Sequence, residues 1–322
     1  MRSPGSLMCL GSGAAFGAMA IFGKLAYDQG ATVGTLLSVR FALAAVLFWG
    51  LVVVSRVANE IRKLDGRDVG IGLALGACGY AAQAGCFFAA LERIDASLLS
   101  LLLYTFPAIV AVAAVLLGRE RLDARKLAAL ALASGGLVLV LAGAGTGKLD
   151  PLGVALGLGA AVVYSTYILS SEGVSKRLHP ALLAAIVCSG AAVSLSAGSA
   201  LLGELRPGDL TIAGWGWLAC LAVVSTVAAV GLFFAGLSRV GPTTASILAT
   251  VEPLVTVLLA FLVFGETLGP AQLAGGALVL AAVLVLQLRP RGRLARRAAG
   301  DRRPLGVPVD GRREVLEDPL RP

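Results

Sequence analysis

The sequence predicts an all-α polytopic membrane protein, with ten transmembrane helices arranged as two inverted five-helix repeats. Its 322 residues are 57% hydrophobic and 14% charged, whereas a soluble domain is nearer half apolar and a quarter charged. Apolar runs of about 20 residues, long enough to cross a hydrocarbon core of about 30 Å, recur along the chain. The second half of the sequence also repeats the first, so the two halves are expected to share one fold.

The internal repeat is clearest between residues 85–122 and 231–268. Pro107 corresponds to Pro253 at an offset of 146 residues. The same offset, without a gap, matches four further pairs, namely Phe87 with Phe233, Phe88 with Phe234, Arg93 with Arg239, and Glu120 with Glu266. An ungapped match of this length indicates a tandem duplication.

The apolar runs place ten spans along the chain. Asp95 precedes the fourth span as an expected N-cap. Three other helix starts carry a proline, Pro151, Pro180 or Pro270, at a position where the missing N–H would have no partner anyway. The expected spans are 7–27, 33–55, 69–91, 95–117, 124–142, 151–171, 180–202, 212–236, 241–264 and 269–288.

These spans divide the chain into four parts. Residues 1–142 are expected to form the first repeat, residues 143–150 a glycine-rich linker, and residues 151–288 the second repeat. Residues 289–322 are rich in Arg, Pro and Gly and show no hydrophobic periodicity. They are expected to form a basic disordered tail that transport does not need.

The distribution of Lys and Arg orients the chain. If the N-terminus is cytoplasmic, most of the 27 basic residues fall in loops and a tail on the cytoplasmic side, as the positive-inside rule requires. We therefore expect a multi-pass protein of the plasma (inner) membrane with both termini in the cytoplasm. The net charge of +8 then reflects a basic tail that faces anionic lipid. The expected partner is accordingly the lipid bilayer and no nucleic acid.

An odd number of spans in each repeat inverts the second copy in the membrane. The segment after the fourth span, residues 118–121, is basic and is expected on the cytoplasmic side. Its counterpart, residues 265–268, has no Lys or Arg and is expected outside. Inverted repeats allow two near-equivalent packings, one open to each side of the membrane, which is a common architecture of secondary transporters.

Several motifs recur in a specific order: Arg40-Phe41 in the second span, Phe-rich third and eighth spans, Pro107 within the fourth, Gly118-Arg119-Glu120 after it, Glu252-Pro253 in the ninth, and Gly-Glu-x-Leu after the ninth. With these motifs, residues 8–288 resemble the EamA-type unit of the drug/metabolite transporter superfamily. The resemblance implies ten helices, cytoplasmic termini and the movement of a small-molecule substrate, often outward. It does not name that substrate. The first repeat has Phe106-Pro107 where the second has Glu252-Pro253, so a carboxylate at this position is unique to the second half.

Other chemistry has little support in the sequence. The single histidine, His179, and five scattered cysteines form no metal-ligand pattern. No phosphate-binding glycine loop is present, and no nucleophile is paired with a histidine inside a span. We therefore expect neither an enzyme nor a bound cofactor or metal. The alternative to a transporter is a non-transporting or channel-like polytopic membrane protein.

Polar residues inside the spans are the candidate substrate-binding groups, because such residues are costly in lipid. These residues are Glu252, Arg40, Tyr80, Gln83, Tyr104, Tyr164, Ser165 and Tyr167. For each of them, hydrogen bonding between helices is the alternative role. The small-xxx-small spacings at Gly13, Gly72 and Gly153 favour close helix crossing within the bundle, and a homodimer remains an open alternative.

Glu252 is the strongest of these candidates. It lies near the bilayer midplane if its span begins at Gly241. Pro253 lacks an N–H and leaves the carbonyl of Ala249 without its helical partner, and Pro107 is expected to kink the matching helix in the same way. A carboxylate beside opened backbone could bind a proton or a cationic amino group of the substrate.

Four other charged residues leave alternatives open. Arg40 could meet a substrate carboxylate, pair with Glu252 or extend its charge to the outer interface. Lys24 is closer to the end of its span, so interfacial placement is expected. Glu120 and Glu266 are expected to be solvated or to cap helices at the membrane surfaces.

Overall fold

The computed structural model describes residues 4–55, 57–61, 64–118, 123–143, 150–175, 177–240, 245 and 248–287. Within these ranges every regular element is a helix, as the composition predicted. The linker residues 144–149 and the tail from residue 288 lie outside the described residues, and so does Glu120.

The helices match the expected spans to within a few residues. In the first repeat they are α1 (Pro4–Gly17), α2 (Met19–Tyr27), α3 (Val33–Val54), the short α4 (Ala58–Ile61), α5 (Gly66–Ala74), η1 (Leu75–Tyr80), α6 (Ala81–Leu91), α7 (Ala96–Leu103), α8 (Phe106–Leu116) and α9 (Ala124–Gly143). In the second they are α10 (Pro151–Ser175), α11 (Pro180–Leu201), the short η2 (Pro207–Asp209), α12 (Ile212–Ala222), η3 (Val223–Ala228), α13 (Ala229–Val240), α15 (Val251–Phe264) and α16 (Pro270–Gln287).

Nine continuous helical segments among the described residues are long and apolar enough to cross a membrane. The ninth expected span, 241–264, is represented by α15 with 14 residues, because residues 241–244, 246 and 247 lie outside the described part of the chain. The third and eighth spans each contain a π-helical segment, η1 and η3. Such segments often occur at functional sites.

Helix caps explain several of the helix starts. Thr32 and Thr211 accept hydrogen bonds from the backbone N–H groups of residues 35 and 214, as N-cap residues do. Asp95 occupies the N-cap position of α7 as expected, but its side chain makes no capping hydrogen bond. The Glu266 carboxylate caps α7 instead, accepting from Ala96 N at 3.1 Å and Ser97 N at 3.0 Å.

The fourth span is interrupted in the middle, and the ninth changes conformation at the matching place. Helix α7 ends at Leu103 and α8 begins at Phe106, with Pro107 in its first turn. Helix α15 begins at Val251, with Pro253 as its third residue. Proline is compatible with a first helical turn but not with a helix interior, because it lacks the N–H group. Each proline therefore lies where a new helix starts.

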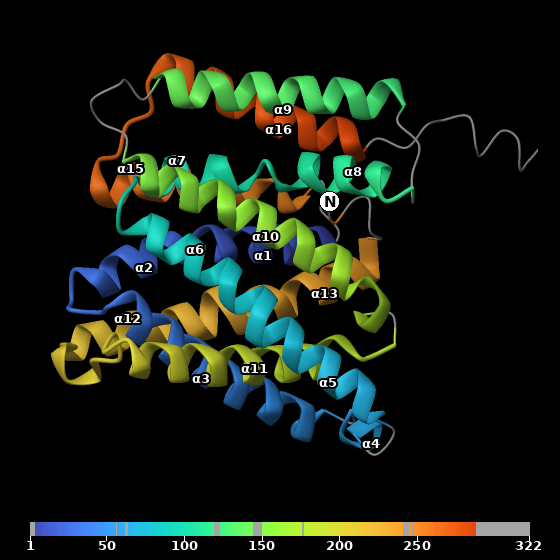
Figure 1. Cartoon of the computed structure of the whole chain (residues 1–322), viewed down its shortest axis with the longest axis vertical. Coiled ribbons are helices and arrows are strands. Elements are labelled where there is room, and N and C mark those ends of the chain that lie inside the picture. The colour runs from blue at the N-terminus through green and yellow to red at the C-terminus, as the bar shows by residue number, and fades with distance from the viewer. Residues whose placement is uncertain are drawn as a thin grey trace, which may run out of the picture. The chain divides into compact units, whose positions relative to one another are not determined.

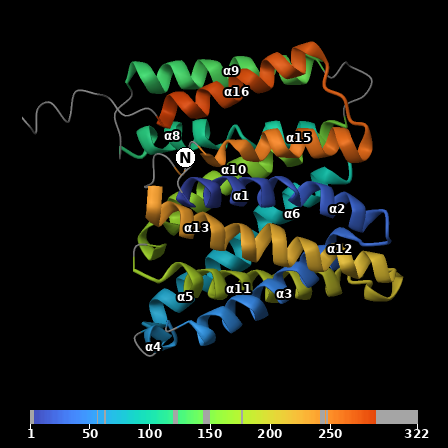
Figure 2. The ribbon, with the colours of Figure 1, turned by 180° about the vertical axis from the view of Figure 1, so that it is seen from behind.

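The two repeats pack against each other through pairs of helices, one helix from each repeat. Helix α1 packs on α13, and the corresponding α10 packs on α6, while α3 lies beside α11, α7 beside α15, and α9 beside α16 (Figures 1 and 2). The contact of α1 with α13 is therefore repeated as the contact of α10 with α6, and each of α3, α7 and α9 packs on its own counterpart in the other repeat. These contacts place helices of both repeats side by side in one bundle.

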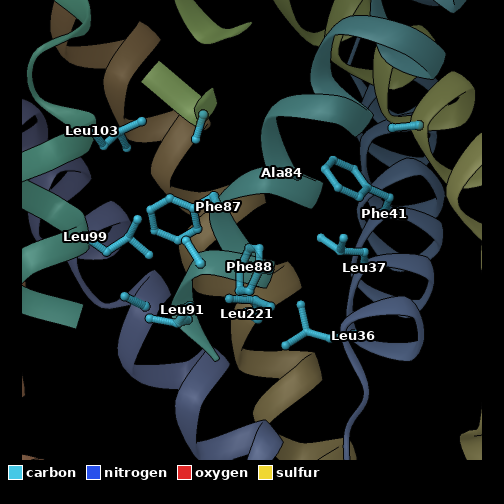
Figure 3. Close-up of a cluster of buried hydrophobic side chains, with 14 of the residues drawn as sticks. Leu36, Leu37, Phe41, Ala84, Phe87, Phe88, Leu91, Leu99, Leu103 and Leu221 are labelled. Carbon is cyan, nitrogen blue, oxygen red and sulfur yellow. The ribbon is translucent and has the colours of Figure 1, made fainter. Parts of the chain in front are cut away.

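The principal core lies where α3, α6, α7 and α12 meet (Figure 3). Phe41 and Phe88 are fully buried there, and Phe87, Leu99 and Leu221 surround them. In a bilayer the packing of such side chains, rather than their removal from water, holds helices together. The Phe-rich third span thus forms the centre of the bundle.

Candidate functional site

A cavity of about 910 Å³ lies among helices from both repeats. It reaches helix ends at Arg125 in the first turn of α9, Ser175 at the end of α10, and Gln287 at the end of α16. Its other limit is at Arg40 and Phe88, both buried inside the bundle. A volume of this size suits a small molecule.

Most of the predicted site residues line this one cavity. They are Glu252, Arg40, Tyr80, Gln83, Tyr104, Tyr164 and Tyr167, together with Pro107. Ser165 has a different position, since its hydroxyl lies 2.7 Å from Ala161 O and 3.2 Å from Phe106 O. Pro253 is buried in the first turn of α15 next to Glu252. The cavity therefore brings together polar groups that are widely separated in the sequence.

Glu252 and Tyr104 connect the two interrupted spans. The Tyr104 hydroxyl oxygen lies 3.0 Å from Glu252 Oε2 and 3.1 Å from Ala249 O. Pro253 leaves that carbonyl of Ala249 without a helical N–H donor. The tyrosine of one repeat thus reaches both the carboxylate and the freed carbonyl of the other.

Arg40 is buried rather than extended to an interface, with 2% of its surface exposed. Its Nε donates to Thr226 Oγ1 at 3.0 Å, and Thr226 in turn donates to Leu221 O at 3.0 Å. The guanidinium carbon lies 5.1 Å from the ring centroid of Phe41 and 5.4 Å from that of Phe88. Pairing of Arg40 with Glu252 is not observed, since Glu252 bonds to Tyr104 instead.

Aromatic rings form a continuous series between these two charged groups. Centroid distances are 4.9 Å from Phe41 to Tyr80, 5.7 Å from Tyr80 to Tyr167, 6.4 Å from Tyr167 to Tyr164, 4.8 Å from Tyr164 to Phe106, and 5.9 Å from Phe106 to Tyr104. The series, which we name the aromatic wall, starts beside Arg40 and ends at the tyrosine that contacts Glu252. Except for Phe41, its members line the cavity.

The sequence reasoning missed two residues of this site. Thr226 lines the cavity and orients Arg40, and its presence in an apolar span was a usable signal, because polar residues there are costly in lipid. Phe106 was noted only as the counterpart of Glu252, yet it links Tyr104 to Tyr164 in the aromatic wall. The sequence shows that residue 106 is aromatic, but it does not predict the contacts of this ring with Tyr104 and Tyr164.

A network at the opposite helix ends joins the repeats away from the cavity. Lys24, for which interfacial placement was expected, has its Nζ 2.7 Å from Glu266 Oε1 and 3.8 Å from Asp95 Oδ1. Glu266 also accepts from the Ser97 hydroxyl at 2.8 Å. Burial alone would raise the pKa of Glu266, but the hydrogen bonds from Lys24 and Ser97 outweigh it and hold that pKa below its usual value.

Metal ligands do not gather in this structure. Among the described residues, no group of three or more His, Cys, Asp or Glu side chains is placed to hold an ion. The Nδ1 atom of His179 accepts from the backbone N–H of Ala181 at 3.3 Å, as an N-cap of α11. The site is therefore described by its cavity, by the charged groups Arg40 and Glu252 inside the spans, and by its aromatic rings.

Comparison with known proteins agrees with this architecture. An uncharacterised transporter of Archaeoglobus fulgidus is 32% identical over 200 residues, which cover 62% of this chain and 70% of that protein. The uncharacterised transporter YcbK of Bacillus subtilis is 28% identical over 284 residues, covering 84% of this chain and 88% of its own length. A chain of known crystal structure matches the fold with a TM-score of 0.59 at 17% identity, covering 88% of this chain and 98% of its own.

The repeat boundaries also agree with a family model. The model of the EamA-like transporter family matches the chain twice, at residues 3–142 and 151–288. These two matches coincide with the two five-span repeats and include the residues of the cavity. The chain therefore belongs to the EamA-like transporter family.

Proposed function

We propose that this protein is a secondary transporter that moves a small metabolite outward across the plasma membrane by alternating access. The cavity is the observation that supports this most, because helices of both repeats surround it and, among the described residues, it reaches helix ends on one side only. The distribution of Lys and Arg assigns these helix ends, and both termini, to the cytoplasmic side. This arrangement is then the inward-facing state of the proposed cycle.

The outward-facing state requires the opposite end of the bundle to open. Glu266 holds that end together, because it contacts Lys24 and Ser97 of the first repeat while belonging to the second. Movement of one repeat against the other would have to separate these groups. A substrate can shift this equilibrium only through a difference in its affinity for the two states.

Glu252 is the proposed coupling group. The Tyr104 hydroxyl carries one proton but faces two acceptors, Ala249 O and the Glu252 carboxylate. A protonated Glu252 can donate to Tyr104 while Tyr104 donates to Ala249, which satisfies all three groups. An ionised Glu252 can only accept, so Tyr104 must leave one acceptor without its proton. Binding of a proton to Glu252 therefore changes the hydrogen bonding at the start of α15.

The remaining cavity residues provide the contact surface for the substrate. Tyr80, Gln83, Tyr164 and Tyr167 line the cavity between the two charges. Pro107 lies at the interruption of the fourth span and keeps a wall of the cavity in place. Opened backbone at membrane depth is tolerated where it lines such a cavity.

The test is flux through purified protein in proteoliposomes, measured over a panel of metabolites and across pH. We expect saturable, gradient-driven flux that depends on pH, and we expect Glu252→Gln to fold and to lose that pH dependence. Glu204→Gln is the matched control, since Glu204 lies on the exposed surface near the end of α11.

Three outcomes would contradict the proposal in different ways. Flux that rises linearly without saturation would favour a channel-like protein. The absence of flux over the whole panel would favour a non-transporting membrane protein. A Glu252→Gln variant with wild-type flux and unchanged pH dependence would be consistent with transport but would contradict the role of Glu252 as the coupling group.

A further inference from the structure

Arg40 has hydrogen-bonding capacity that the protein does not use. Its guanidinium makes one hydrogen bond within the described residues, from Nε to Thr226, and no carboxylate among them lies within 4.0 Å of it. The side chain is nevertheless 98% buried and lines the cavity. The rings of Phe41 and Phe88 lie beside the guanidinium, but a buried cation without an anionic partner is unfavourable in a membrane span. Nη1 and Nη2 therefore remain available to an anion in the cavity.

Two neutral donors accompany this guanidinium. Gln83 has 7% of its surface exposed and lines the cavity, and neither its amide nor the Tyr80 hydroxyl forms a hydrogen bond within the part of the chain that the structure describes. Tyr80 ends the π-helical segment η1, and Gln83 follows one turn later in α6. Tyr80 also packs on Phe41, the residue next to Arg40. One cation and two neutral donors thus line the same cavity.

The charge of Arg40 is not a requirement of the scaffold. Helix α11 is apolar at the corresponding place, because Ile186 lies at the offset of 146 and Val187 lies as far from the start of α11 as Arg40 does from the start of α3, and both are buried. The same position of the fold is therefore filled by an apolar side chain in one repeat. The presence of Arg40 in the first repeat is therefore better explained by a ligand that it binds than by a requirement of the fold.

We propose that Arg40, with Gln83 and Tyr80, forms a subsite for the carboxylate of an organic monoanion, whose apolar body lies along the aromatic wall. This inference rests on the proposed transport function and names the substrate class. One guanidinium balances one negative charge, and because Nε is bound to Thr226, the two remaining nitrogens present the planar pair of donors that matches a carboxylate. Tyr80, Tyr164 and Tyr167 offer ring faces to the rest of the molecule.

The test measures thermal unfolding of the full chain in lipid nanodiscs. The probes are propionate, benzoate and phenylacetate, each compared with its neutral amide at the same concentration. We expect the best carboxylate, at tenfold excess over its Kd, to raise the Tm of the wild type by roughly 3 °C, and the amides to leave it unchanged. Arg40→Met should lose this response, whereas the matched control Ile186→Met should keep it.

The ligand-free variants separate a binding role from a structural one. If Arg40 awaits an anion, Arg40→Met removes an unpaired buried charge, and the Tm of the empty protein should stay equal or rise. A Tm that falls by several degrees in Arg40→Met and recovers in Arg40→Lys would assign Arg40 a structural role and overturn the proposal. Equal responses to carboxylates and amides in the wild type, or a carboxylate response that persists in Arg40→Met, would also overturn it.

Flux measurements distinguish this inference from the transport proposal. Carboxylate binding that depends on Arg40, without flux in proteoliposomes, would support the subsite and contradict transport. Saturable flux of a neutral or cationic metabolite that is unchanged in Arg40→Met would support transport and contradict the subsite.

Discussion

The ammonium nitrogen of Lys24 lies 2.7 Å from a carboxylate oxygen of Glu266, and this ion pair joins the first span of one repeat to the end of the ninth span of the other. The same carboxylate caps the N-terminus of α7, so three spans meet at one side chain. Carboxylates are favoured at helix N-termini by the helix dipole. Glu266 therefore stabilises both a helix start and the contact between repeats.

Replacing Glu266 with Gln should lower the free energy of unfolding at neutral pH by about 1.5–3 kcal/mol, the typical value of hydrogen bonds to a charged group. Because the pKa of Glu266 is lowered in the folded state, its contribution is fully present above the usual carboxyl pKa of about 4.3 and is lost as the pH falls through the lowered value. The difference in Tm between wild type and Glu266→Gln should thus be constant from pH 7 to 5 and shrink below about pH 4.

Glu92 provides a control, because its pKa is shifted in the opposite direction to that of Glu266. Burial and the nearby Glu204 raise the pKa of Glu92 above its usual value, so any stability that depends on its protonation is present below the usual pKa and is lost as the pH rises. Glu92→Gln should leave the Tm at pH 7 unchanged or raise it. A fall in Tm at pH 7 as large as that of Glu266→Gln would contradict the assigned difference between the two carboxylates.

Replacing Tyr104 with Phe should lower both the stability and the pH dependence of flux. The variant leaves Ala249 O and the Glu252 carboxyl group without the tyrosine hydroxyl, at a cost of about 1–3 kcal/mol for an unsatisfied buried group. Tyr27→Phe is the control, since the Tyr27 hydroxyl donates to Phe88 O at 2.9 Å and is not part of the cavity lining. It should lose similar stability and keep the pH dependence. If both variants kept that dependence, Tyr104 would have no part in coupling.

Two adjacent glycines in α9 should respond differently to alanine. A Cβ atom at Gly136 would lie 2.6 Å from Gly275 O of α16, whereas a Cβ at Gly135 would have no atom within 4 Å. Gly136→Ala should therefore destabilise the protein by about 1–3 kcal/mol through overpacking. Gly135→Ala should be neutral or stabilising by up to about 1 kcal/mol, because alanine favours helix. Unfolding in nanodiscs measures both, and equal effects would contradict the close contact of α9 with α16.

Reporter fusions test the membrane orientation. A reporter joined after Gln287 should be active only as a cytoplasmic fusion, and one inserted at Gly145 should report an external location, because five spans precede it. The measurement compares a cytoplasmic fluorescent reporter with a periplasm-active enzyme at each site. A cytoplasmic signal from the Gly145 insertion would contradict the inversion of the second repeat.

The fold was largely predictable because hydrophobic runs and their duplication are local properties of the sequence. The span limits were placed within a few residues, and the duplication predicted that the two halves share one fold. Helix caps were less predictable. Asp95 had the right residue type at the right position, but the capping group came from Glu266, which is distant in the sequence. A local rule cannot anticipate a cap from another repeat.

The residue types of the candidate site were predictable from the sequence, but the hydrogen-bond partners of these residues were not. Arg40 and Glu252 stood out as charges inside spans, and both line the cavity. Their partners, Thr226 and Tyr104, depend on how α3 meets η3 and how α7 meets α15. These contacts are set by tertiary packing, on which the spacing of residues along each span carries no information.

The pairing of α9 with α16 also has a consequence for biosynthesis. Helix α9 packs far more extensively on α16 than on any other described element, yet α9 ends at Gly143 and α16 begins only at Pro270. At about 5–20 residues per second, α9 spends on the order of ten seconds in the bilayer before its partner is made. During that time the small-residue face around Gly136 is open to lipid or to other membrane proteins. The contact of α9 with α16 therefore forms only after the spans of the second repeat that lie between them have been synthesised.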